Sequence, residues 1–197
     1  RTAATLAEVL ESLGYAVCWL GASSAVKPRG ITRYREYERF DQLDEALQSL
    51  LAEQRFDAVI HAAAVSDFSL SGGAEPGKLA SGGCLTLALQ PNPKLIGRIK
   101  SYSRHGEPCL VGFKLTAGAD PASVSAAVRR QFDQSPVDYV VHNDFAQIQA
   151  GEHRFTVFGR DPDGDLRTLG DYEHARDLAV GLSSLLKEAV VGREASA

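Results

Sequence analysis

The segment DAVIHAAAV, residues 57–65, is an almost continuous apolar run with the length of a β-strand. Such runs are typical of strands that are buried on both faces, as in a parallel sheet covered by helices. We expect an amphipathic helix just before it, with Asp41 as its N-cap and an end near Gln54. A strand that follows a helix so closely indicates an α/β architecture.

The same alternation continues on both sides of this segment. We expect further strands over residues 15–20, 33–37, 84–89, 109–114 and 137–141. We expect further helices over residues 2–13, 93–102, 121–132 and 171–190, the second and third capped by Asn92 and Asp120. Asp163-Gly164 predicts a hairpin turn between strands over 154–158 and 166–169. Together these patterns predict a Rossmann-like α/β fold, with a mostly parallel sheet, helices on both faces and a C-terminal β-hairpin plus helix.

The length and composition suit one domain with a full core. The chain has 197 residues, of which 44% are hydrophobic and 23% charged. We expect one nucleotide-binding-like domain over residues 1–191 and a loose tail over 192–197. The net charge of −4 argues against a general affinity for nucleic acid or anionic membranes. No apolar run reaches the roughly 20 residues of a membrane span.

Two features bear on the compartment and the N-terminus. Cys18, Cys84 and Cys109 are far apart, with no metal-binding spacing, so we expect reduced cysteines in a cytoplasmic protein. The chain has no methionine and opens at Arg1 directly in a helical pattern. We therefore expect either a processed N-terminus or a preceding segment.

Ligands of open parallel sheets bind beyond the carboxyl ends of the strands. Small or polar turns follow four of the expected strands, at residues 21–24, 63–68, 112–114 and 142–144. The small side chains of Ala62, Ala63 and Ala64 allow a ligand to come close to the backbone, and Asp67 could orient its hydroxyl or amide. A tightly packed strand end with Asp67 opening a turn explains these residues equally well.

The next two strand ends also allow two interpretations. In Gly112-Phe113-Lys114 the aromatic ring suits a planar base and the cation suits phosphates, although an apolar strand with an edge lysine is the simpler explanation. In Asn143-Asp144 the amide suits a base or ribose and the carboxylate suits Mg²⁺, whereas an Asx turn is the alternative.

No motif of a covalent nucleophile, a P-loop or a zinc site is present in the sequence. His61 falls within the apolar run and is interpreted as a core histidine. From the residues alone, the sequence predicts an α/β enzyme or binding domain with a small-molecule site at the strand ends.

The sequence resembles the phosphopantothenate–cysteine ligase family of coenzyme A biosynthesis, over about residues 2–186. The resemblance rests on the order and spacing of six segments: Ala62–Phe68, Lys78–Ser81, Leu85–Leu89, Asn92–Ile96, Leu110–Leu115 and Asp138–Asp144. The version Gly-Phe-Lys-Leu looks more like the stand-alone ligases than the bifunctional flavoproteins. The resemblance implies an amide-forming ligase that joins 4′-phosphopantothenate and L-cysteine.

The implied reaction has two steps. The phosphopantothenate carboxylate attacks the α-phosphate of CTP or ATP, with Mg²⁺, and pyrophosphate leaves. The amine of cysteine then displaces the nucleotide from the acyl-nucleotidylate. Such chemistry depends on positioning and charge neutralisation rather than on a side-chain nucleophile.

The resemblance also implies roles for single residues. Nucleotide binding falls to Gly112, Phe113, Lys114, Asn143 and Asp144. Phosphopantothenate binding falls to Ala63, Ala64, Asp67 and Lys78. Lys78, like Lys114, is also a candidate for contacting the nucleotide or a phosphate. The family forms homodimers, and the segment Cys84–Ile96 is a candidate for part of the subunit contact.

The sequence departs from the family pattern in two places. The family's opening strand, Gly-Gly-Thr loop and catalytic asparagine precede the position at which this sequence begins, so no catalytic residue is assigned. The family's lysine-rich flap is replaced by a segment with Arg129 and Arg130. Two alternatives therefore stay open: a non-catalytic relative with a regulatory role that binds nucleotide or pantothenate, and an unrelated enzyme that binds NAD(H).

Overall fold

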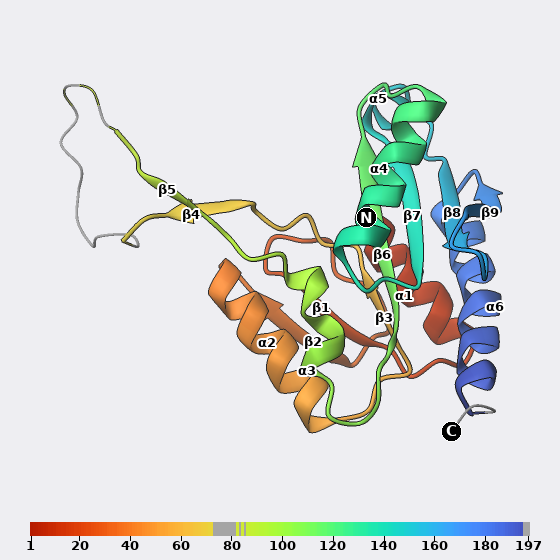
Figure 1. Ribbon diagram of the computed structural model, residues 1–197. Coiled ribbons are helices and arrows are strands. Elements are labelled where there is room, and N and C mark those ends of the chain that lie inside the picture. Colours follow the sequence, from red (N-terminus) through yellow and green to blue (C-terminus); the bar gives the residue numbers. More distant parts are fainter. Residues whose placement is uncertain (73–81, 83, 85, 195–197) are drawn as a thin grey trace.

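The computed structural model of the chain describes residues 1–72, 82, 84 and 86–194. Its centre is a five-stranded sheet with the order β3-β6-β7-β8-β9 (Figure 1). These strands are β3 (Ala58–His61), β6 (Cys109–Thr116), β7 (Tyr139–Asp144), β8 (Phe155–Arg160) and β9 (Leu166–Tyr172). β3, β6 and β7 pair in parallel, and β8 and β9 continue the sheet antiparallel. The predicted mostly parallel sheet with a C-terminal hairpin is confirmed.

Two smaller sheets accompany the central one. β1 (Cys18–Ala22) and β2 (Arg33–Tyr37) pair in parallel. β4 (Phe68–Leu70) and β5 (Leu89–Pro91) pair antiparallel and stand away from the rest of the molecule (Figure 1). We call residues 68–72 and 86–91 the arm. Residues 66–67 and 92–94, which join the arm to the rest of the chain, are its two roots.

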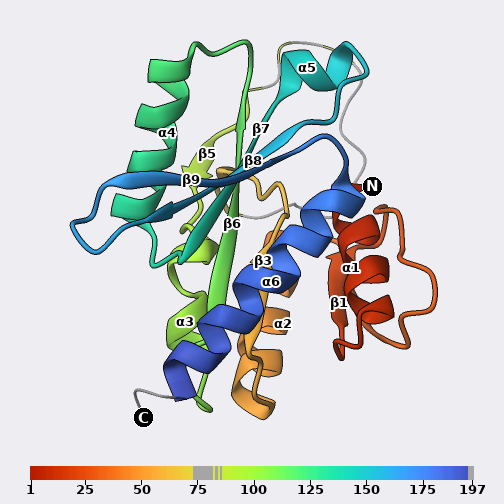
Figure 2. The ribbon, with the colours of Figure 1, turned by 90° about the vertical axis from the view of Figure 1, so that its right-hand side faces the viewer.

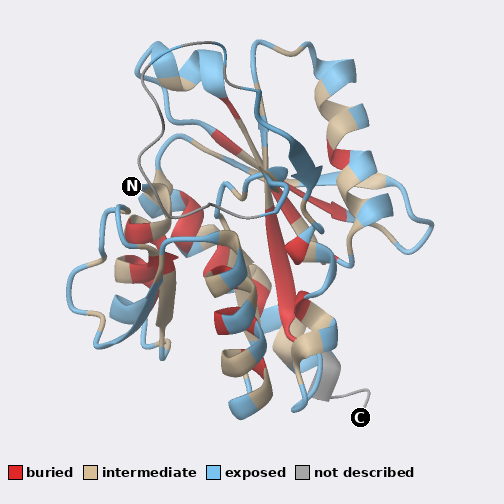
Figure 3. Ribbon diagram, turned by 90° about the vertical axis from the view of Figure 1, so that its left-hand side faces the viewer, coloured by how far each residue is buried: buried red, intermediate tan, exposed pale blue. Residues whose placement is uncertain are grey.

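Helices cover both faces of the central sheet, as predicted. They are α1 (Thr2–Ser12), α2 (Phe40–Glu53), α3 (Ile99–Tyr102), α4 (Pro121–Gln134), α5 (Phe145–Gln149) and α6 (Ala175–Glu194), with a 3₁₀ turn η1 (Leu95–Gly97). α1 and α6 lie together on one face (Figure 2), where they build a cluster with β6, β7 and β8. α2, α3 and α4 build the second cluster on the other face. Figure 3 shows the inner sides of these helices buried.

Burial of apolar side chains on both faces stabilises the sheet. The first cluster includes Leu6, Val9, Val111, Val141, Val157, Leu178 and Leu182. The second includes Leu43, Leu47, Leu51, Ile99, Leu110, Val128 and Val140. Adjacent positions of β6 and β7 face opposite clusters, as the alternation of a strand requires. The same alternation determines which residues of the candidate site lie on the same face of the sheet.

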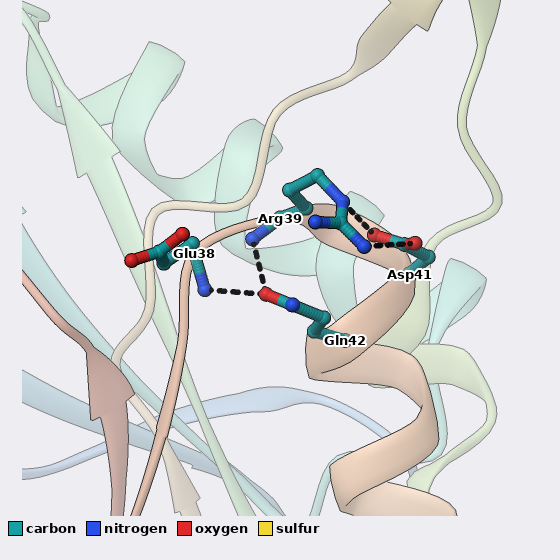
Figure 4. A network of polar contacts seen from close by, with 4 residues as sticks. All are labelled: Glu38, Arg39, Asp41 and Gln42. Carbon is teal, nitrogen blue, oxygen red and sulfur yellow. Dashed lines mark hydrogen bonds and ion pairs between the residues drawn. The ribbon is translucent and has the colours of Figure 1, made fainter. Parts of the chain in front are cut away.

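The start of α2 differs from the prediction. The N-cap is Arg39, and Asp41 lies inside the first turn, where its carboxylate pairs with the Arg39 guanidinium (Figure 4). The side-chain oxygen of Gln42 accepts hydrogen bonds from the backbone N–H groups of Glu38 and Arg39, at 2.8 and 3.1 Å. Gln42 thus bonds the backbone just before the helix, and the N-cap expected of Asp41 is wrong. Asp120, in contrast, does cap α4 through the backbone N–H of Ser123.

Several strand boundaries also differ. The run 57–65 is strand only over Ala58–His61, and residues 62–66 form an irregular segment instead. The expected strand over 84–89 is wrong, since the described residues before Leu89 are irregular and β5 begins only there. The expected strand over 15–20 is shifted to Cys18–Ala22. β7 includes His142 and Asn143, which were expected to follow it.

Two helix predictions need correction as well. The helix expected after Asn92 is a 3₁₀ turn and a short α3, because the Asn92 side chain bonds the carbonyl of Ser66 rather than capping a helix. α6 begins at Ala175, since β9 runs on to Tyr172, and it continues past the expected tail boundary to Glu194. None of the described helices is both long and apolar enough to cross a membrane.

Candidate functional site

A small hollow lies where the carboxyl ends of β3 and β6 meet the roots of the arm. Its volume is about 150 Å³, and it is lined by His61, Ala63, Val65, Ser66, Asp67, Asn92, Pro93, Lys94, Leu95, Ile96, Phe113 and Gln131. Drug-sized ligands usually need roughly 300 Å³ or more. The hollow is therefore suited to one section of an extended substrate, with the remainder lying outside it.

Three of the predicted site residues meet at this hollow. Ala63 and Asp67 come from the segment after β3, and Phe113 comes from β6. Ala64 is exposed beside them and is not part of the lining. Lys78 lies outside the described residues. The structure thus brings together residues that the sequence assigned to different substrates.

The segment that carries Asp67 is fastened to the segment after β5. Asn92 donates from its side-chain amide to the carbonyl of Ser66 at 3.0 Å, and from its backbone N–H to the carbonyl of Asp67 at 2.8 Å. Lys94 forms an ion pair with the Asp67 carboxylate. Sequence reasoning missed this arrangement because its partners are more than twenty residues apart and carry no local pattern.

Gly112 does not itself line the hollow, but its lack of a side chain determines how two lining residues pack. A Cβ there would lie 2.4 Å from Nε2 of Gln131, 2.9 Å from Cδ1 of Ile96 and 3.2 Å from Cγ1 of Val137. Real Cβ contacts are longer, so the glycine is what allows these side chains to pack onto β6. Gly112 thus shapes the hollow through Ile96 and Gln131, which line it.

His61 is a lining residue that the sequence interpretation placed in the core. It is the last residue of β3 and pairs across the sheet with Gly112. Its partly buried ring loses hydration, which lowers its pKa to about 4. The imidazole is therefore neutral at physiological pH. The sequence held no signal for this position, because the strand was expected over residues 57–65 and His61 fell in its middle, whereas β3 ends at His61.

The other nucleotide candidates divide between the two faces of the sheet. Phe113 pairs with Val141 and Leu115 with Asn143, so Phe113 and Asn143 share the face covered by α1 and α6. Lys114 pairs with His142 on the opposite face. Within the described part of the chain, Lys114 and Asn143 form no side-chain hydrogen bond or ion pair, so both are available to a ligand.

The carboxylate of Asp144 is engaged in hydrogen bonds within the protein. Its carboxylate accepts hydrogen bonds from the Thr116 hydroxyl at 2.7 Å and from the backbone N–H groups of Gly118, Ala119 and Ala146 at 3.0, 3.4 and 2.8 Å. It caps α5 and fixes the turn after β6, which the sequence interpretation had left open as an Asx turn. These bonds, that from Thr116 first, hold the pKa of Asp144 far below its usual range.

The hydrogen-bond donors around Asp144 bear on whether the protein itself can hold an Mg²⁺ ion at this carboxylate. The Asp144 oxygens face donors, and no group of three or more metal-ligating side chains occurs among the described residues. This set does not fit a metal held by the protein at Asp144.

Replacing Asp144 with Asn is expected to lower the thermal midpoint of unfolding by several degrees at pH 7. A lowered folded-state pKa stabilises the fold above the ordinary aspartate value of about 3.9, and this stabilisation fades as the pH falls towards the folded-state pKa. The gap between wild type and variant should therefore shrink below about pH 4, as followed by circular dichroism. Asp163→Asn, in the exposed hairpin turn, is the control. A gap that widens on acidification would refute this role.

Arg129 and Arg130, considered as substitutes for the family's lysine flap, lie on α4. Arg129 forms an ion pair with Asp165 of the hairpin loop at 3.6 Å. A second hollow, of about 520 Å³, lies between α4, the hairpin and α6, and begins at the amino end of β7 with Val137 and Asp138. None of the predicted site residues that the structure describes lines it, so the hollow at the carboxyl ends is the candidate site.

A sequence profile of the family described as the DNA/pantothenate metabolism flavoprotein C-terminal domain matches residues 1–183. The chain belongs to this family. This membership confirms the family resemblance that was drawn from the six sequence segments. It excludes the alternative that the chain is an enzyme unrelated to this family.

One curated relative in the family is the coenzyme A biosynthesis bifunctional protein CoaBC of Thermococcus kodakarensis. It is 34% identical over 158 residues, which is 79% of this chain. The chain spans only 38% of the length of that relative. The expected likeness to stand-alone ligases stays a prediction.

Solved structures of similar proteins support the fold. The DNA/pantothenate metabolism flavoprotein from Streptococcus pneumoniae matches with a TM-score of 0.79 at 22% identity, over 95% of this chain and 87% of that chain. A mutant Cab2 in complex with phosphopantothenate-cysteine matches with a TM-score of 0.73 at 16% identity, over 98% of this chain and 79% of that chain. At these identities the likeness concerns the fold of the DNA/pantothenate metabolism flavoprotein family.

Proposed function

We propose that the chain is the ligase unit of an enzyme that joins 4′-phosphopantothenate and L-cysteine in coenzyme A biosynthesis. The observation that carries the proposal is the meeting of Ala63, Asp67 and Phe113 at one hollow, in a chain of this family. The reaction passes through an acyl-nucleotidylate formed with CTP or ATP, with release of pyrophosphate. Mg²⁺ accompanies the nucleotide.

The residues of the hollow suit a part of phosphopantothenate that has hydrogen-bonding groups but no phosphate. Ala63 leaves the backbone open to the substrate, and the Asp67 carboxylate is an acceptor for a hydroxyl or amide of the substrate. Asn92 and Lys94 hold this acceptor in place through the contacts described above. The substrate carboxylate is thereby positioned for attack on the nucleotide, and no side-chain nucleophile is needed.

The nucleotide is proposed to lie along Phe113 and Asn143, which share one face of the sheet. The ring offers an apolar surface to the base, and the amide offers both a donor and an acceptor. Lys114 lies on the other face at the same edge and is proposed to contact phosphates. Neither CTP nor ATP is favoured by these side chains.

Asn143→Ala is expected to raise KM for the nucleotide by about 10-fold, because one pair of hydrogen bonds is lost. KM for phosphopantothenate should change little. Steady-state kinetics with each substrate varied in turn will separate the two effects. Gln147→Ala, which removes an exposed amide from α5, is the matched control. Wild-type kinetics in the Asn143 variant would remove this residue from the site.

The arm is proposed to pack against a second copy of the chain. Its apolar side chains are exposed to solvent: Phe68 is 54% exposed, Leu70 is 39% exposed, and Leu87 and Leu89 are each 59% exposed. An exposed apolar patch of this kind marks an interaction surface. The arm overlaps the segment Cys84–Ile96 that the family resemblance assigned to the subunit contact, and its roots line the hollow.

The double variant Leu87→Asp/Leu89→Asp is expected to convert a dimer into a monomer, since two charges would enter an apolar contact. Sedimentation velocity at micromolar protein measures the change. Val26→Asp, an exposed apolar residue of the loop after β1, is the control and should leave the dimer intact. A wild-type monomer, or a variant that stays dimeric, would contradict the proposed contact.

Pyrophosphate release tests the proposed function. The purified full-length protein should release pyrophosphate only when phosphopantothenate and a nucleotide are both present, with CTP or with ATP. Binding of either compound without any release would instead indicate the non-catalytic relative with a regulatory role. Release that does not require phosphopantothenate would refute the proposed activation step.

A further inference from the structure

His61 occupies a distinct place in the hollow. It is the last residue of β3, and its cross-strand partner Gly112 has no side chain. Strand partners in a parallel sheet point to the same side, so the imidazole stands beside the space that Gly112 leaves. Ile96 and Gln131 fill part of this space and line the hollow together with His61.

The ring nitrogens of His61 have no partner among the described residues and are not fully buried. The His61 side chain makes no hydrogen bond or ion pair with any other described residue, although the backbone of His61 pairs with β6. No fully buried side-chain nitrogen or oxygen in the described part of the chain lacks a partner. Both ring nitrogens are therefore accessible, and the hollow is the space that the side chain borders. A polar group that lines a hollow and has no protein partner is able to bind a ligand.

The charge state of the ring selects the kind of group that it can bind. Burial keeps the imidazole neutral, with one nitrogen as a donor and the other as an acceptor. A neutral donor–acceptor pair suits an uncharged hydroxyl or amide better than a phosphate, which prefers Arg or Lys. Asp67 on the same hollow, whose charge is paired with Lys94, is an acceptor that likewise favours a donor group.

We infer that His61 is a specificity-determining residue that hydrogen-bonds an uncharged hydroxyl or amide of the acyl substrate. The inference rests on the proposed function for the identity of this substrate, since phosphopantothenate carries both kinds of group. His61 acts in binding and recognition, and takes no part in the transfer of the nucleotidyl group. It adds a polar side chain to the wall of the hollow beside Ala63.

Calorimetric titration of phosphopantothenate into the wild-type protein and two variants tests the role of His61. His61→Phe keeps a flat ring but removes both polar atoms, and it should weaken binding by about 10-fold or more. His61→Gln keeps one donor and one acceptor and should recover most of the affinity. The exposed His153 supplies the matched control, His153→Phe, which should bind like the wild type.

The outcomes separate this inference from the proposed function. Equal affinities in wild type and His61→Phe, with circular dichroism showing both folded, would overturn the role of His61 and leave the ligase proposal intact. Weaker binding in His61→Phe that is not recovered in His61→Gln would indicate a packing role and also overturn it. Binding that depends on His61 without any pyrophosphate release would support His61 while refuting the ligase activity. A wild type that does not bind phosphopantothenate would overturn both.

Discussion

Asp67→Asn is expected to lower kcat/KM for phosphopantothenate by about 10- to 100-fold, the usual cost of losing a hydrogen bond to a charged group. The amide keeps the size of the side chain but removes the charge that pairs with Lys94. It also offers donors where the substrate donor needs an acceptor. Steady-state kinetics at saturating nucleotide measures the loss.

The thermal stability of this variant should stay near that of the wild type. The ion pair between Asp67 and Lys94 is exposed, and such pairs contribute about 1 kcal/mol or less. Asp57→Asn is a matched control, because Asp57 is equally exposed and pairs with Arg55 at the other end of β3. If Asp67→Asn kept wild-type kcat/KM, the hollow would not be the acyl-substrate site.

Gly112→Val is expected to lower the free energy of unfolding by about 3 kcal/mol, near the upper end of the usual cost of overpacking. A side chain at this position collides with Gln131, Ile96 and Val137. Because Gln131 and Ile96 line the hollow, the variant should also bind phosphopantothenate more weakly. Urea unfolding and calorimetric titration measure the two effects.

Gly97→Ala is the control for the loss of stability. A Cβ at Gly97 has no neighbour nearer than the carbonyl of Gln134 at 4.0 Å, so this substitution should be tolerated. A Gly112→Val protein with wild-type stability would show that the wall of the hollow can adjust freely. The packing account of Gly112 would then be wrong.

The sequence predicted the elements whose signals are local. Asp120 and Pro121 open α4 as expected, and the hairpin around Gly164 forms with a positive φ of 88° at that glycine. The predictions that failed depend on distant partners. Asn92 was expected to cap a helix, but its side chain is taken by the carbonyl of Ser66 on the other root of the arm.

The candidate site was only partly predictable for the same reason. Strand ends pointed to Ala63, Asp67 and Phe113, because the carboxyl ends of parallel strands must meet at one edge. The pattern could not show that Gly112 leaves room beside His61, since the register between β3 and β6 is a tertiary feature. Nor could it show that four donors converge on Asp144.

Formation of the amide product is the most direct test of the central claim. The purified full-length protein is incubated with phosphopantothenate, isotopically labelled cysteine and either CTP or ATP, and the products are identified by mass spectrometry. We predict labelled phosphopantothenoylcysteine in an amount equal to the pyrophosphate released, with at least one of the two nucleotides. Absence of the labelled product with both nucleotides, from a folded protein that binds phosphopantothenate, would contradict the account.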